Sequence, residues 1–148
     1  MEVSGEHHFS APREAVWQAM LDPKALQASM PGCERFIEVG PRSYDLTIKV
    51  GISAIRGTYS GNVKVVDPIE NESYRLVVTG NGKPGSVQGD AKLTLSDHAA
   101  GGTLVNYAGD VKAQGAIARM GSRLLGGAAK LMIGQFMKGM EKQVEGRT

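Results

Sequence analysis

The sequence predicts an α+β fold in which a curved, antiparallel seven-stranded sheet is covered on its concave face by a long C-terminal helix. Polar and apolar residues alternate near the N-terminus and again between residues 33 and 112, as in half-buried strands. Turn-forming residues interrupt the second stretch at hairpin spacing, which favours antiparallel neighbours. From about residue 115 the apolar period changes to that of a helix. A sheet and a single long helix must pack together to bury their apolar sides.

The first strand and two short helices are predicted within the first 32 residues. Polar and apolar side chains alternate along residues 2–9. A serine followed shortly by Pro12 predicts a helix start, because a hydroxyl caps free amides and proline is tolerated in the first turn. Asp22 and Pro23 repeat this pattern for a second short helix, which ends at Met30-Pro31-Gly32.

Six further strands and the long helix complete the predicted order. The strands are expected at Glu34–Val39, Ser43–Val50, Ala54–Val66, Tyr74–Thr79, Ser86–Leu95 and Gly102–Lys112. The turn signals between them are Gly40-Pro41, Gly51, Asp67-Pro68, Gly80-Asn81-Gly82 and Ala99–Gly101. The helix is expected from Gly115 to about Val144, and its wheel places Ile117, Met120, Leu124, Ala128 and Leu131 on the face toward the sheet.

Length and composition favour one domain over residues 1–148 and exclude several classes of protein. The chain has 148 residues, 41% of them hydrophobic, which suffices for a core. Its 20 glycines stand singly inside apolar patterns, which excludes a linker protein and collagen. The net charge of +2 is too small to indicate nucleic-acid binding. One cysteine, no signal peptide and no membrane-spanning apolar window predict a cytoplasmic protein.

Motifs spread over most of the chain resemble one known family. They are Gly5, Pro12–Trp17, Leu21-Asp22-Pro23, Met30–Glu34, Gly57–Gly61, Gly80-Asn81-Gly82, Leu93-Thr94-Leu95, Gly102-Thr103, Tyr107, Asp110-Val111, Gly115, Leu124 and Gln135-Phe136. With them the sequence resembles the G-subunit family of carbon monoxide dehydrogenase, which belongs to the START-like superfamily and has the helix-grip fold. The Pro31-Gly32 pair, the Tyr107 strand and the Gly115 helix start are its more specific features.

The resemblance implies a small accessory protein without catalytic residues. Such a protein accompanies aerobic molybdenum hydroxylases of the carbon monoxide dehydrogenase type. Its cavity, between sheet and long helix, is associated with a lipophilic quinone such as menaquinone, carried between the hydroxylase and the membrane respiratory chain. Some relatives add a C-terminal extension for membrane attachment, whereas this sequence stops at Thr148. The expectation is therefore transient contact at the inner face of the cell membrane.

The predicted ligand-binding residues are the inward positions of the strands and the apolar face of the long helix. They are His7, Tyr44, Leu46, Ile48, Tyr59, Val63, Leu76, Val78, Val87, Ala91, Tyr107, Val111, Met120, Gly121, Leu124, Ala128 and Leu131. Apolar inward positions are also what a packed core requires, so both interpretations stay open for each residue. The small members Gly61, Gly89, Ala91, Gly109 and Gly121 favour a dry cavity on the order of a few hundred Å³.

Few polar side chains are expected to face that cavity. Tyr44, Tyr59 and Tyr107 are either half-buried strand residues or hydrogen-bond donors to a quinone carbonyl. His7 shares a strand face with apolar residues, so it is either a satisfied core histidine or a ligand group. His8 points the other way, and no residue set has the spacing of metal ligands or of a nucleophile elbow. No catalytic residue and no metal site are predicted.

The long helix also carries a predicted contact surface. Arg119, Arg123 and Lys130 form a basic stripe, and a methionine-rich end adds Ile133, Phe136, Met137 and Met140. A basic amphipathic helix fits an anionic membrane surface or an acidic partner such as the hydroxylase. Two alternatives to the carrier are kept: an assembly or membrane-recruitment factor that binds no ligand, and a START-like cyclase or hydrolase that uses the same cavity.

Overall fold

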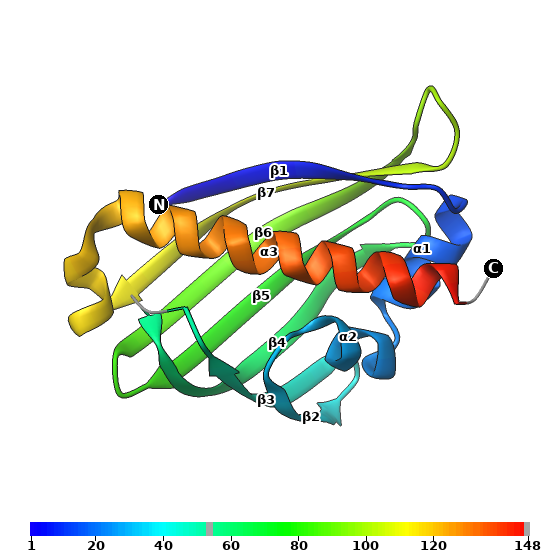
Figure 1. Ribbon diagram of the computed structural model, residues 1–148. Coiled ribbons are helices and arrows are strands. Elements are labelled where there is room, and N and C mark those ends of the chain that lie inside the picture. Colours follow the sequence, from blue (N-terminus) through cyan, green and yellow to red (C-terminus); the bar gives the residue numbers. More distant parts are fainter. Residues whose placement is uncertain (53–54, 147–148) are drawn as a thin grey trace.

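The computed structural model describes residues 1–52 and 55–146, which form an open antiparallel sheet of seven strands with helices on its concave face (Figure 1). The strands are β1 (Glu2–Phe9), β2 (Cys33–Gly40), β3 (Ser43–Val50), β4 (Gly57–Ile69), β5 (Ser73–Gly82), β6 (Gly85–Asp97) and β7 (Thr103–Gln114). Their order in the sheet is β1-β7-β6-β5-β4-β3-β2, so the first and the last strand along the chain are neighbours. The predicted fold class is confirmed.

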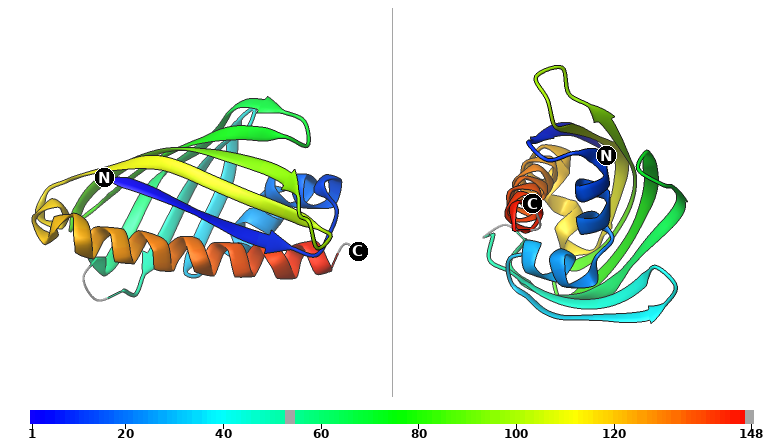
Figure 2. Two further views of the ribbon diagram at one scale, coloured as in Figure 1. Left: turned by 90° about the horizontal axis from the view of Figure 1, so that it is seen from above. Right: turned by 90° about the vertical axis from the view of Figure 1, so that its right-hand side faces the viewer.

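The helices are α1 (Arg13–Met20), α2 (Pro23–Ser29), the short 3-10 helix η2 (Ala116–Met120) and α3 (Gly121–Glu145). Figure 2 shows the sheet curving around α3, with α1 and α2 at the end where α3 finishes. The helix α3 runs along the edge strand β1 in the same direction, because Gly126 lies beside Met1 and Glu141 lies beside His7. On its other side Gly139 packs on Ser29 of α2, where a Cβ would come within 2.9 Å of the serine Cα.

The buried side chains form two separate clusters on the concave face. The larger cluster lies around α1, α2 and the C-terminal half of α3, and includes Phe9, Val16, Trp17, Met20, Tyr44, Tyr74, Val105, Met137, Met140 and Val144. The smaller cluster lies at the other end, where α3 begins, and consists of Val50, Ile55, Tyr59, Ile117 and Ala128 with partly buried neighbours. The helix is therefore anchored near both of its ends by different sets of residues.

Two predicted turns prove to lie inside strands. The β5–β6 ladder continues to the pair Gly82 and Gly85, so the hairpin turn is Lys83-Pro84 rather than Gly80-Asn81-Gly82. Glycine at 82 is needed because a Cβ there would approach the Thr58 carbonyl oxygen to 2.7 Å. The predicted start of the third strand of that stretch, Ala54, lies outside the described residues.

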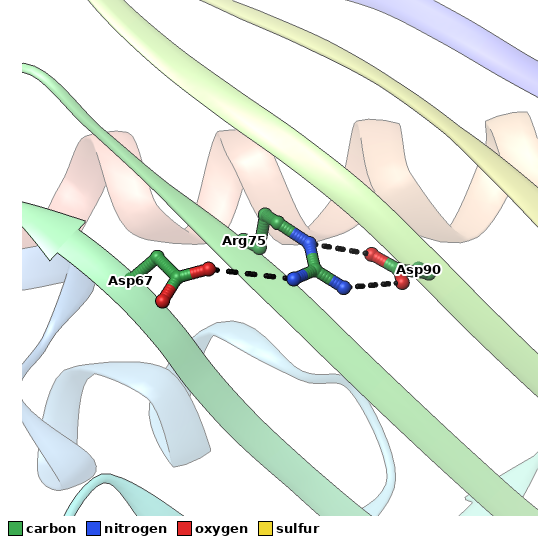
Figure 3. A network of polar contacts seen from close by, with 3 residues as sticks. All are labelled: Asp67, Arg75 and Asp90. Atoms are coloured by element: carbon green, nitrogen blue, oxygen red, sulfur yellow. Dashed lines mark hydrogen bonds and ion pairs between the residues drawn. The ribbon is translucent and has the colours of Figure 1, made fainter.

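The predicted turn at Asp67-Pro68 is a bulge within β4. The β4–β5 pairing slips between Val66 and Ile69, and Asp67 adopts a positive φ of 51°. Its carboxylate accepts a hydrogen bond from Arg75, which also donates to Asp90 of β6 (Figure 3). These exposed contacts join three strands across the outer face of the sheet, and the carboxylates of Asp90 and Asp67 raise the pKa of the guanidinium. The bulge lets β4 bend without ending.

The long helix does not begin at Gly115 as predicted. Residues 116–120 form η2, and Gly121 breaks the helix with a φ of +83° before α3 starts. A wheel drawn from residue 115 is therefore out of phase with α3. Leu124 and Leu131 are 58% and 51% exposed and do not face the sheet, whereas Leu125 and Met132 pack on the smaller cluster.

Truncation of single residues on α3 tests this helix orientation. We expect Met140→Ala to lower the free energy of unfolding by about 2–5 kcal/mol, because Met140 is completely buried in the larger cluster. Leu131→Ala, on the same helix, is expected to change it by less than about 0.5 kcal/mol, because Leu131 is 51% exposed and lies outside both clusters. Urea unfolding measures both values, and equal losses would contradict the orientation.

Candidate functional site

The candidate site is the inner face of the sheet between the two clusters, beneath α3. Eight of the predicted lining residues point inward there and are only partly buried: Ile48, Leu76, Val78, Val87, Ala91, Tyr107, Val111 and Met120. Interior positions of a seven-stranded sheet under a helix are expected to be fully buried when the core is close-packed. Six of them pack against one cluster or the other, and Val78 and Val111 lie between the two clusters. Their residual exposure indicates that apolar surface remains accessible on the inner face.

Apart from His7, the other predicted lining residues divide into two groups. Tyr44, Leu46, Tyr59, Val63 and Ala128 are buried, so they form the ends and floor of the candidate site. Leu124, Leu131 and Gly121 are exposed, and they lie on the solvent side of the helix. Their prediction as inward residues is wrong because the break at Gly121 rotates α3 relative to a continuous helix.

The strand glycines serve two different purposes. A Cβ at Gly61 or Gly109 would overlap the backbone of the neighbouring strand, so these glycines permit the close approach of coiled strands rather than leaving space. At Gly89 the nearest atom to an added Cβ is 3.9 Å away, on Val78. Gly89 therefore leaves room on the inner face, between Val78 of β5 and Val111 of β7.

The three predicted tyrosines are not equivalent. Tyr44 stacks on Phe36 with ring centroids 5.0 Å apart, and the hydroxyl of Tyr59 donates to the Ile55 carbonyl at 2.7 Å. Burial raises the pKa of both phenols. Tyr107 instead lies over Gly5, where any Cβ would overlap its hydroxyl, and within the described chain that hydroxyl has no hydrogen-bond partner. Of the three, Tyr107 is the one on a strand that pairs with β1, the strand of His7.

His7 is the polar group that points inward from β1. Its Nε2 atom is buried and makes no hydrogen bond within the described residues, although it lies 3.3 Å from Glu141 Oε1 of α3. The two atoms are close enough for an ion pair when the imidazole is protonated, but they are not aligned as a hydrogen bond requires. The ring meets the edge of Phe9 at 4.9 Å between centroids. The side chains of His7 and Glu141 are 22% and 38% exposed, so the pair lies at the seam between sheet and helix.

Sequence reasoning missed Glu141. Its signal is the spacing of Met137, Glu141 and Val144, which places a carboxylate on the buried face of α3. A single acidic residue in such a position needs a partner, and the inward-pointing histidine of β1 was available for that inference.

The residues of the predicted contact surface on α3 lie in two different settings. Met137 and Met140 are buried in the larger cluster, and Ile133 and Phe136 pack against it, so the methionine-rich end is core. Arg119, Arg123 and Lys130 are exposed as predicted. The apolar residues beside them are Leu124 and Leu131. We call Arg123, Leu124, Gly127, Lys130 and Leu131 the outer face of α3, since their spacing places them on one side of the helix.

The two best-defined concave regions lie elsewhere, on the outer face of the sheet. One, of about 490 Å³, is lined by Ser4, Glu6, Lys92, Thr94 and Asn106 among others, and a smaller one of about 270 Å³ adjoins it. Both are shallow and open to solvent. Across residues 1–52 and 55–146, no three His, Cys, Asp or Glu side chains are placed to hold a metal ion. None of the helices in the same ranges has the length and apolar character needed to cross a bilayer.

Comparison with known proteins gives one family and one fold. The family model for the G subunit of carbon monoxide dehydrogenase (CoxG) matches residues 5–145. A conserved protein from Geobacillus kaustophilus is 30% identical, with a TM-score of 0.94 over 98% of this chain and 95% of its own. A START superfamily protein from Mycobacterium smegmatis has a TM-score of 0.75 at 17% identity, over 99% of each chain. No curated protein matches the sequence.

Removal of single hydroxyls tests the roles of the tyrosines. Tyr59→Phe is expected to cost about 1–3 kcal/mol of unfolding free energy, because it leaves the buried Ile55 carbonyl without a donor. Tyr107→Phe is expected to cost less than about 0.5 kcal/mol, since its hydroxyl makes no hydrogen bond in the described structure. Thermal and urea unfolding of the two variants give the comparison. A larger loss for Tyr107→Phe would show that its hydroxyl is structural.

Proposed function

Because the chain belongs to the CoxG family, the G-subunit family of carbon monoxide dehydrogenase, we propose that it is a non-catalytic carrier of a lipophilic quinone of the menaquinone type. The observation that supports this most is the partly exposed apolar inner face between the two buried clusters. The family and the START-like fold already favour a ligand-binding accessory protein. The inner face favours an apolar ligand, because its lining is aliphatic and carries few polar groups.

A prenylated quinone fits this lining better than a polar metabolite does. Its long hydrocarbon tail has poor solubility in water, so transport outside a membrane requires a protein that shields it. The strip formed by Val78, Val87, Ala91 and Val111 offers contact along several strands, while His7 and Tyr107 supply hydrogen-bonding groups for a head group. The proposed partner is a molybdenum hydroxylase of the carbon monoxide dehydrogenase type, whose electrons the quinone would carry to the respiratory chain.

The outer face of α3 supports a second element of the proposal, transient docking on an anionic membrane. Two exposed leucines lie between basic side chains on a helix that covers the ligand site. Each lysine or arginine near an anionic surface contributes about 1 kcal/mol of attraction, and the leucines add apolar area that is buried on contact. Docking through this face would bring the ligand site next to the bilayer that holds the quinone.

Ligand content tests the carrier proposal directly. Gently purified protein, denatured and extracted with organic solvent, is expected to yield a prenylated quinone by mass spectrometry. Gly89→Leu is expected to reduce the quinone recovered at least about tenfold while the protein still folds, because the new side chain fills space that the backbone leaves open. The matched control is Gln88→Leu, the adjacent residue on the outer face, which should retain the quinone.

Three outcomes would contradict the carrier. Absence of any prenylated quinone from the extract, together with no binding of added menaquinone, would favour an assembly factor without ligand. Turnover of a bound compound, abolished by His7→Leu, would favour the enzyme alternative. Recovery of the hydroxylase with this protein from native extract, whether or not quinone is present, would also favour the assembly factor.

Vesicle binding tests the docking face. The protein is expected to sediment with vesicles that contain phosphatidylglycerol and not with vesicles of phosphatidylcholine alone. Leu131→Glu should reduce binding at least about tenfold, because it removes apolar contact and places a negative charge at the surface. Ile69→Glu is the control, since Ile69 is 54% exposed but lies on the opposite side of the sheet. Equal effects of both substitutions would exclude this face as the contact.

A further inference from the structure

One group on the inner face is left without the hydrogen bond that buried polar atoms normally have. His7 Nε2 is inaccessible to solvent and makes no hydrogen bond within the described residues, although it lies 3.3 Å from Glu141 Oε1, close enough for an ion pair when the imidazole is protonated. Buried nitrogen atoms of this kind are rare in folded proteins, because each costs about 1–3 kcal/mol. Such an atom is expected where a ligand completes the hydrogen bonding.

Two further polar groups lie near His7 on the same side of the sheet. Tyr107 extends from β7, which pairs with β1 so that Gly5 opposes Tyr107 and His7 opposes Val105. Both His7 and Tyr107 point to the inner face, as diagonal neighbours on adjacent strands. Glu141 reaches this position from α3, with its Oε1 3.3 Å from His7 Nε2. The His7–Glu141 pair therefore lies at the seam of β1 and α3, and the Tyr107 hydroxyl lies over Gly5, two residues before His7 on the same face of β1.

The chemistry of this group distinguishes the two redox forms of a quinone. A carboxylate only accepts hydrogen bonds, a phenol donates or accepts, and a neutral imidazole nitrogen does either according to its tautomer. A hydroquinone hydroxyl can donate to Glu141 and accept from His7. Either form can pair with the Tyr107 hydroxyl, but a quinone carbonyl only accepts, so the carboxylate beside His7 repels it.

We propose that His7, Tyr107 and Glu141 form a head-group subsite that binds the hydroquinone form more tightly than the quinone form. This inference rests on the proposed function. From the subsite toward η2 the inward residues of β6 and β7 are Ala91, Gly89, Val87, Gly109, Val111 and Ala113, all apolar. The tail of the bound molecule therefore runs toward the smaller cluster, away from α1 and α2.

Selective binding of the reduced form has a consequence for electron transfer. Reduction of the quinone takes up two electrons and two protons, and the electrons come from the hydroxylase in the proposed function. A protein that favours the product of this step raises the midpoint potential of the bound couple. For a two-electron couple, a tenfold difference in affinity corresponds to about 30 mV. Binding would thus make the carried quinone easier to reduce.

The experiment compares both redox forms of one probe, a 1,4-naphthoquinone with a single isoprenoid unit, by anaerobic titration calorimetry. We expect the native protein to bind the hydroquinone at least about tenfold more tightly than the quinone, as one charge-assisted hydrogen bond provides. Glu141→Gln should bring the two affinities within about threefold, mainly by weakening the hydroquinone. Glu6→Gln, on the outer face of β1, is the matched control and should keep the preference.

Two more variants and a second readout make the result decisive. His7→Phe should weaken binding of the hydroquinone, while the quinone keeps most of its affinity through its apolar contacts. This variant serves as the test if Glu141→Gln does not fold. Tyr107→Phe should weaken both forms, and the midpoint potential of the bound probe should fall in Glu141→Gln. Equal affinities in the native protein, or a preference that survives both Glu141→Gln and His7→Phe, would overturn the subsite alone. Binding of neither form would count against the carrier itself.

Discussion

The packing of α3 on the concave face of the sheet is the contact on which the rest of the structure depends. Without the helix, the inner faces of β1, β5, β6 and β7 would expose a continuous apolar surface, which water strongly disfavours. The helix cannot rely on its own propensity, because Gly126, Gly127, Gly134 and Gly139 each cost about 1 kcal/mol relative to alanine. Burial of side chains such as Met140 and Val144 must offset that cost. The sheet therefore holds the helix, and the helix covers the sheet.

Residue patterns were sufficient to predict the order of the elements and the inward face of each strand. Alternation is decisive in a sheet, since the side-chain period is two and one face is buried. Turns were harder to place: Gly80 and Gly82 have the composition of a turn, yet both stay in the ladder. At Gly82 the backbone of the neighbouring strand approaches too closely for a side chain. A glycine can mark a close approach of two strands as well as a turn, and composition alone does not distinguish the two.

The candidate site was predictable on the strands and not on the helix. Strand positions such as Val78, Ala91 and Tyr107 follow from alternation alone. The helix positions depend on where the helix starts, and the positive φ of Gly121 separates η2 from α3. A phase error of part of a turn at this point led to the prediction that Leu124 and Leu131 face inward. In the structure both are exposed, and Leu125 and Met132 face inward instead. Glu141 was missed for the same reason, because the side of α3 on which it lies is evident only once the helical phase of α3 is known.

Because the two clusters differ in size, α3 is packed more extensively on the sheet at its C-terminal end than at its N-terminal end. Its C-terminal half packs on α1, α2 and β1, and carries the completely buried Met140. Its N-terminal half meets the smaller cluster, begins at a glycine with positive φ, and contains adjacent glycines at 126 and 127. Separation of helix from sheet costs less where less apolar area is buried, so the proposed ligand site would open at the η2 end. A tail that points to this end and a head group held at His7 would then enter and leave by the same path.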